Sequence, residues 1–158
     1  DLTSAVLNGA TITAAAESRE AEANIYFEDA NLGNADLSGA TITATANGSY
    51  AEANIYFEDA NLGNADLSGA TITATANGSS AGAGIDFSSA NLVTADLSGS
   101  KLTAVGTSYD VISFYAANLS NANLSGVDLS ATVIILPSPP PSTPPSLPSP
   151  PSPSPSPP

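Results

Sequence analysis

Apolar residues recur at every fifth position along most of this chain, as in the run Phe27, Leu32, Leu37 and Ile42. This period matches neither the 3.6 residues of a helical turn nor the two-residue alternation of a plain strand. A small residue, usually alanine, lies two positions before most of the apolar residues. The pattern predicts a solenoid in which each five-residue segment contributes one large and one small inward side chain.

A longer repeat is superimposed on the period of five, since residues 21–49 are identical to residues 51–79. Four five-residue segments make a block of 20 residues, and we expect each block to form one coil. The blocks are Ile25–Ala44, Ile55–Ala74, Ile85–Ala104 and Ile112–Ala131, with a partial block at Asp1–Ala14. The segments between blocks are Ala15–Asn24, Thr45–Asn54, Thr75–Gly84 and Val105–Val111, and we expect them to be loops that leave one corner and stack into a ridge.

The segments Ala-Asn-Leu-Gly-Asn at residues 30–34 and Ala-Asp-Leu-Ser-Gly at residues 35–39 resemble the pentapeptide-repeat family, as does Ala-Asn-Leu-Ser-Asn at residues 117–121. The resemblance implies an all-β fold for residues 1–136, a right-handed parallel β-solenoid of about five 20-residue coils. The central Leu or Phe and the preceding Ala would face inward. Neighbouring coils about 4.8 Å away would complete each core layer and pair the backbone.

The last 22 residues, 137–158, contain all 13 prolines of the chain and form a second region. Proline lacks an N–H donor, so this composition predicts a polyproline II tail. Its Ser-Pro order resembles the hydroxyproline-rich glycoproteins of green-algal and plant extracellular matrix, which implies hydroxylated, arabinosylated prolines and galactosylated serines. The residues concerned are Pro137, Pro139, Pro140, Pro141, Pro144, Pro145, Pro148, Pro150, Pro151, Pro153, Pro155, Pro157, Pro158, Ser138, Ser142, Ser146, Ser149, Ser152, Ser154 and Ser156. A plain linker and a ligand for proline-binding modules are the alternatives.

Two Asn-x-Ser sequences, at Asn47 and Asn77, fall in the predicted loops, where we expect N-glycosylation. Two further sequences of this kind, at Asn118 and Asn123, fall on the coil wall. We expect Asn118 to stay unmodified, because its side chain belongs to a stacked column.

Superposed coils align polar residues into columns on the surface. Asn31, Asn61, Asn91 and Asn118 would form a ladder of side-chain amides. Asp36, Asp66 and Asp96 form a second column, where repulsion between carboxylates makes them weak candidates for calcium. A solvated acidic face is the simpler interpretation of that column, and of the pairs Glu28-Asp29 and Glu58-Asp59.

Composition narrows the function classes further. The chain has no His and no Cys, which removes the usual partners for nucleophilic catalysis, so we expect neither an enzyme nor a cofactor. A net charge of −13, with Arg19 and Lys101 as the only basic side chains, argues against nucleic acid and anionic membranes as partners. The longest apolar run, residues 133–136, is too short to span a membrane.

The sequence therefore predicts a structural extracellular glycoprotein of the cell surface, cell wall or a secreted fibre. Its partners would be further copies of itself, joined head to tail, and covalent glycans. The partial coil at residue 1 and the extra segment Thr132–Leu136 would leave open strand edges for this assembly. The alternative is an acidic binding module, such as a pentapeptide-repeat mimic of DNA or a solenoid that binds calcium, glycans or ice. The ice-binding variant rests on stacked Thr-Ile-Thr triplets at residues 11–13, 41–43 and 71–73.

Overall fold

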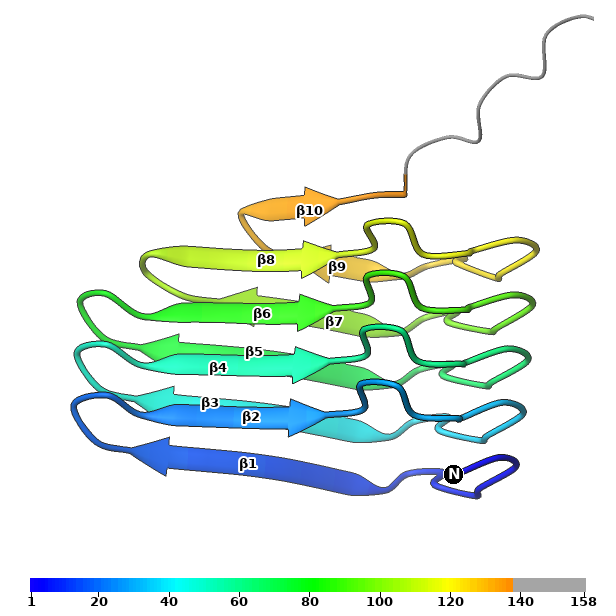
Figure 1. The fold of residues 1–158 in the computed structure, drawn as a ribbon, viewed down its shortest axis with the longest axis horizontal. Coiled ribbons are helices and arrows are strands. Elements are labelled where there is room, and N and C mark those ends of the chain that lie inside the picture. The colour runs from blue at the N-terminus through cyan, green and yellow to red at the C-terminus, as the bar shows by residue number, and fades with distance from the viewer. Residues whose placement is uncertain (138–158) are drawn as a thin grey trace, which may run out of the picture.

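A computed structural model describes residues 1–137 as an all-β parallel solenoid of about four turns, with no helix in that part of the chain (Figure 1). Accordingly, no helix among these residues is long and apolar enough to cross a membrane. The strands are β1 (Thr11–Glu17), β2 (Glu22–Tyr26), β3 (Thr41–Asn47), β4 (Glu52–Tyr56), β5 (Thr71–Asn77), β6 (Gly82–Asp86), β7 (Lys101–Val105), β8 (Tyr109–Ser113), β9 (Asp128–Ser130) and β10 (Val133–Ile135). The expected polyproline tail and its glycan acceptors, apart from Pro137, lie outside the described residues.

The strands alternate between two five-stranded parallel sheets. One sheet has the order β1-β3-β5-β7-β9, and the other has the order β10-β8-β6-β4-β2. Each strand pairs with the strand one turn later, so that Ile42 lies beside Ile12 on one side and Ile72 on the other. The spacing is 30 residues between Ile42 and Ile72 and 27 between Leu102 and Leu129. The expected 20-residue coil is therefore wrong, because one turn takes up both a block and the segment between blocks.

The ten-residue segments expected to be loops are mostly strand. Segment Thr45–Asn54 supplies the end of β3 and the start of β4, and only residues 48–51 connect the two strands. The physical reason is a two-residue alternation within the segment: Ala44 and Ala46 are buried, whereas Thr43 and Thr45 are partly exposed. Alternation of this kind builds a strand with one inward face. The predicted ridge of loops is replaced by two flat sheets joined by short turns (Figure 1).

The five-residue segments form the other side of each turn. Isolated β-bridges join Asn31 to Asn61 and Asp36 to Asp66, which makes two narrow parallel ladders. The chain bends sharply after each bridge, with positive φ at Asn34 (57°) and Gly39 (63°). Glycine and asparagine tolerate this left-handed conformation better than other residues, which accounts for their place at these two turns, although Ser89, Thr94 and Ala116 adopt it at equivalent positions.

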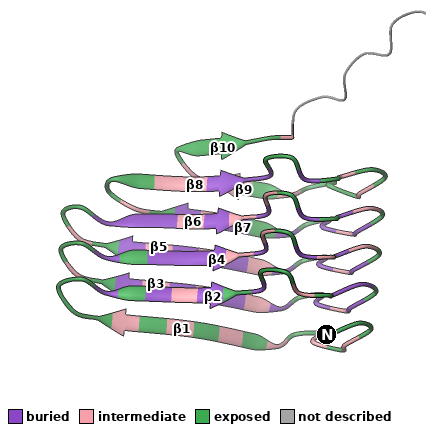
Figure 2. Cartoon of the chain, viewed as in Figure 1, coloured by how far each residue is buried: buried purple, intermediate pink, exposed green. Residues whose placement is uncertain are grey.

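The core runs along the solenoid axis as columns of like residues. Phe27, Phe57, Phe87 and Phe114 stack with ring centroids 4.7, 4.6 and 5.0 Å apart. Leucines of the middle turns, such as Leu62 and Leu92, are completely buried. The inward positions of the central Leu or Phe and of the preceding Ala are therefore confirmed. Figure 2 shows that burial is concentrated in the middle turns, whereas β1 and β10 at the two ends have no buried residue.

Truncation of a middle-turn leucine should cost far more stability than truncation of its counterpart in the last turn. Leu67 is 1% exposed and Leu124 is 45% exposed, although both belong to the same column. We expect Leu67→Ala to lower the free energy of unfolding by about 3 kcal/mol and Leu124→Ala by less than about 1 kcal/mol. Urea unfolding followed by circular dichroism measures both losses, and equal losses would contradict the stacked core.

Candidate functional site

The two ends of the solenoid leave core columns partly uncovered. β1 and β3 share the sequence Thr-Ile-Thr-Ala, but Ile42 in β3 is buried, whereas Ile12 in β1 is only half-buried. Leu2, in the same first turn, is 40% exposed. The difference in exposure does not come from the sequence of β1. It arises because no turn within residues 1–137 covers the outer side of this strand.

The opposite end carries an apolar hollow of about 200 Å³. Its lining is Phe114, Leu119, Leu124, Val127, Leu129 and Leu136. Strand β10, which is Val-Ile-Ile, lies at the edge of its sheet beside this end, and all three of its side chains are exposed. Within residues 1–137, the end at β10 thus combines an apolar surface with a strand edge that no other strand pairs.

The predicted ladder of asparagines forms over three of its four members. Asn61 Nδ2 donates to Asn31 Oδ1 at 2.9 Å, and Asn91 Nδ2 donates to Asn61 Oδ1 at 2.9 Å. Asn118 continues the backbone bridges, but its Oδ1 accepts from Ser120 of its own turn. Hydrogen bonds between neighbouring amides explain this column as a structural element.

The column of Asp36, Asp66 and Asp96 also forms, and each carboxylate closes a local turn. Oδ1 of each residue accepts the backbone N–H of the serine two positions later, at 3.0, 2.8 and 2.8 Å. The hydroxyl of Ser38 is the main cause that lowers the pKa of Asp36 below its ordinary 3.8, and Ser98 acts in the same way on the pKa of Asp96.

A second acidic group gathers at the corner after β2, β4 and β6. The carboxylate of Asp86 raises the pKa of Glu58 above its ordinary value, and partial burial, Asp59, Glu28 and Asp29 add to the effect. Within residues 1–137, no three His, Cys, Asp or Glu side chains converge in a way that could hold a metal ion. The acidic columns are thus lines of spaced charges rather than a chelating cluster.

The expected N-glycosylation residues Asn47 and Asn77 are exposed, but they lie at the ends of β3 and β5 rather than in long loops. Their side chains meet, since Asn77 Nδ2 donates to Asn47 Oδ1 at 2.9 Å. A glycan on Asn77 would be attached at this same nitrogen. Glycosylation of the two residues stays a prediction.

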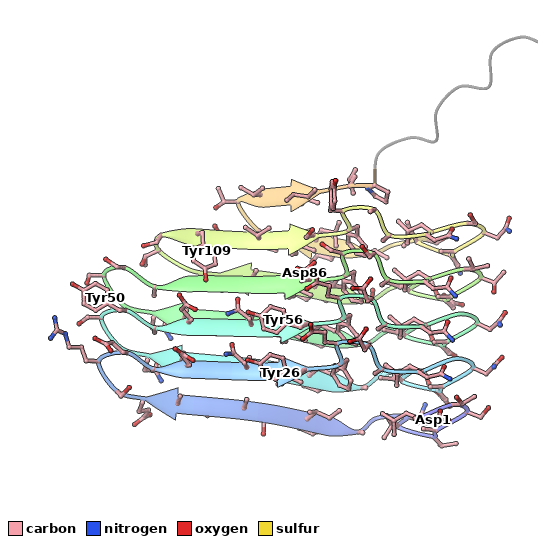
Figure 3. All side chains as sticks on the ribbon, in the orientation of Figure 1. Asp1, Tyr26, Tyr50, Tyr56, Asp86 and Tyr109 are labelled. Carbon is pink, nitrogen blue, oxygen red and sulfur yellow. The ribbon has the colours of Figure 1, made fainter. Side chains whose placement is uncertain are left out.

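The outer face of the second sheet brings together side chains that the period of five did not predict to be neighbours. Figure 3 shows Tyr26, Tyr56, Asp86 and Tyr109 on this face, contributed by four successive strands. A shallow depression of about 100 Å³ lies between Tyr56 and β8. A sequence signal was present, because residues 82, 84 and 86 depart from the Glu, Asn and Tyr at residues 52, 54 and 56.

Loss of the Ser38 hydroxyl should shift the titration of Asp36. Because the folded-state pKa is lowered, this carboxylate stabilises the fold above about pH 4, and the contribution is lost as the pH falls through the folded-state pKa. We expect Ser38→Ala to raise the pKa of Asp36 toward 3.8, measured by carboxyl ¹³C NMR. Ser120→Ala, which removes a hydroxyl bonded to the uncharged Asn118, is the matched control. An unchanged Asp36 pKa in Ser38→Ala would contradict this assignment.

Comparison with known protein families identifies the five-residue repeat. The family model described as pentapeptide repeats (8 copies) matches residues 112–134. No curated protein matches the sequence of the chain.

Among solved structures, the chain is similar to a pentapeptide repeat protein, Rfr23, from the cyanobacterium Cyanothece 51142. The identity is 17%, the match covers 84% of this chain and 89% of the other, and the TM-score is 0.26. HetL, a pentapeptide repeat protein involved in heterocyst differentiation regulation from Nostoc sp. strain PCC 7120, is 25% identical over 80% of this chain and 68% of its own, with a TM-score of 0.26. These TM-scores are too low to carry an argument about function. The chain contains pentapeptide repeats and folds as a parallel β-solenoid.

Proposed function

We propose that this chain is a non-enzymatic structural glycoprotein of the extracellular surface, whose solenoids stack end to end into a filament. The observation that carries the proposal is the apolar hollow beside β9 and β10, where the core columns remain uncovered. In the middle turns, each such column is buried by the turn above it. A further turn, supplied by a second copy, would bury the columns at the end in the same way.

Leucines of the first and last described turns lie in the same columns. At one end, Leu119 and Leu124 continue the columns of Leu92 and Leu97. At the other end, Leu2 and Leu7 lie in these same two columns, one turn before Leu32 and Leu37. A second copy placed on the same axis would therefore set leucine on leucine, as the turns within one copy do. The match supports an axial arrangement of copies over a lateral one.

Burial of these side chains provides the driving force. Leu124 is 45% exposed and Leu136 is 64% exposed, and fully covering them would contribute roughly 2 and 3 kcal/mol at 25 cal/mol per Å². The strand edges add hydrogen-bonding groups that a second chain can pair. The contact joins unlike ends and uses one axis, so it does not close into a ring but extends into a filament.

The extracellular and glycan-bearing parts of the proposal rest on sequence. Residues 137–158 consist of Pro and Ser with one Thr and one Leu, and the acceptor residues named above repeat through the segment. The strong negative charge and the glycans would keep the filaments hydrated and would oppose their lateral association.

A single charge placed in the hollow should abolish stacking without unfolding the solenoid. We expect the wild-type chain to form species that grow with concentration in sedimentation velocity, and Leu124→Lys to sediment as a monomer. Lysine buried against Phe114 and Leu129 of the hollow would lose its hydration without gaining a partner.

The matched control for this experiment is Thr41→Lys, which adds the same charge on the wall between Thr11 and Thr71 of the neighbouring strands. It should assemble like the wild type, and circular dichroism should be unchanged in both variants. A wild-type chain that stays monomeric at all concentrations, or equal effects of the two lysines, would contradict axial stacking.

Glycan attachment is tested separately on chain isolated from its natural source. Intact mass and glycopeptide mapping should find hydroxyproline with attached pentoses within residues 137–158. Unmodified prolines on a chain recovered from inside cells would contradict the extracellular assignment but leave the stacking result intact.

A further inference from the structure

The outer face of the second sheet carries a column of tyrosines that stops at β6. Tyr26 of β2 pairs with Tyr56 of β4, and their rings stack with centroids 5.2 Å apart and planes 11° from parallel. The next residues in this column are Asp86 of β6 and Ser113 of β8. One face of the Tyr56 ring is therefore covered by Tyr26, and the other borders a position where no third ring is present.

The missing ring leaves a slot about one ring thick. Neighbouring strands lie about 4.8 Å apart, so Tyr56 and Ser113 are about 10 Å apart across β6. The depression of about 100 Å³ found there is lined by Asn54, Tyr56, Gly84, Ile85, Asp86, Val111 and Ser113. A flat guest that takes the place of the third tyrosine would be in contact with the open face of Tyr56.

Two glycines of β6 shape the floor of this surface, and only the one at Gly84 leaves it open. Gly84 replaces the asparagine found at residues 24 and 54, and a Cβ there would come within 2.9 Å of Asn54 Oδ1. Gly82 replaces a glutamate, and the ring of Tyr109 occupies the space of the missing side chain. The slot thus lies among Tyr56, the Gly84 backbone and the edge of β8.

Polar groups converge on the slot from several sides. Asp86 Oδ1 accepts the backbone N–H of Ser88 at 2.8 Å and also the Ser88 hydroxyl, and within residues 1–137 no side chain bonds to Oδ2. Asn54 is 6% exposed, and its Nδ2 donates to Asn24 Oδ1 at 3.3 Å. Gly84 ends this asparagine ladder, so Asn54 Oδ1 receives no amide from β6, and the side chain of Asn54 also lies within hydrogen-bonding reach of the Tyr109 hydroxyl. A carboxylate oxygen and an amide oxygen therefore border an aromatic face.

We infer that this slot binds one ring of a neutral saccharide, with an apolar face of the sugar on Tyr56 and hydroxyls donating to Asp86 and Asn54. Both oxygens accept hydrogen bonds, which suits the many hydroxyl donors of a sugar. A tyrosine ring offers a flat, rigid contact surface with little conformational entropy to lose. The nearby carboxylates Glu52, Glu58 and Asp86 disfavour an anionic sugar. An organic cation is less well matched, because the slot offers one open ring face rather than a cage.

The test uses the full chain and the methyl glycosides of galactose, glucose, mannose and arabinose, each titrated by ¹H–¹⁵N NMR to about 50 mM. We expect at least one glycoside to shift the amide signals of residues 54, 84, 86 and 113, with a dissociation constant on the order of 1–10 mM. Asp86→Tyr should abolish these shifts, since a third ring continues the Tyr26–Tyr56 stack and fills the slot. The variant restores the residue of the other two repeats, so it is expected to fold.

Two controls separate the slot from a general surface effect. Asp86→Asn keeps an oxygen for the Ser88 turn and keeps the slot open, so binding should remain, weakened a few-fold. Tyr26→Thr removes the ring that covers the other face of Tyr56 and should leave the glycoside shifts at the four residues in place. Leu124→Lys should bind as the wild type does, which keeps this result independent of stacking.

The proposal is overturned if none of the four glycosides shifts these signals, or if the shifts persist in Asp86→Tyr. It is also overturned if tetramethylammonium chloride, added in the same range, shifts them while the glycosides do not.

Discussion

Hydrogen bonding between successive turns is the constraint on which the rest of this structure depends. A parallel solenoid turn pairs only a few of its backbone groups within itself, such as the Ala35 N–H with the Leu32 carbonyl, so most N–H and C=O groups need a partner in the turn before or after. The pairing holds Ile12, Ile42 and Ile72 in one line and does the same for every other position of the repeat. Like residues therefore stack on like, and the columns of phenylalanine, leucine and asparagine are all consequences of one register.

The same constraint decides where function can reside. In the middle turns, inward columns are buried and outward columns repeat, so these surfaces offer little that is asymmetric. Exceptions arise where the repetition stops. Within residues 1–137, it stops along the axis at the apolar hollow beside β9 and β10, and it stops on the wall at β6, where Gly82, Gly84 and Asp86 replace the residues of the preceding turn. The proposed stacking and the proposed sugar slot each arise from one of these interruptions.

The inward residues were predictable from sequence because the period of five is visible in Leu32, Leu37 and their repeats. The ladder from Asn31 to Asn91 followed from the same alignment. The size of the turn was not predicted, because segments such as Thr45–Asn54 break the period of five and were taken for loops. Their own alternation, with Ala44 and Ala46 inward, marks them as strand. The tyrosine face was missed for the same reason. Tyr26 and Tyr56 can be aligned in space only once residues 22–26 are recognised as part of a strand.

Small-angle X-ray scattering of the full chain over a wide concentration range tests axial stacking most directly. Axial stacking predicts that the maximum dimension of the particles grows with concentration while their cross-sectional radius of gyration stays constant, because copies add along one axis. Scattering that is unchanged over the whole range, or growth of the cross-section in place of the length, would contradict it.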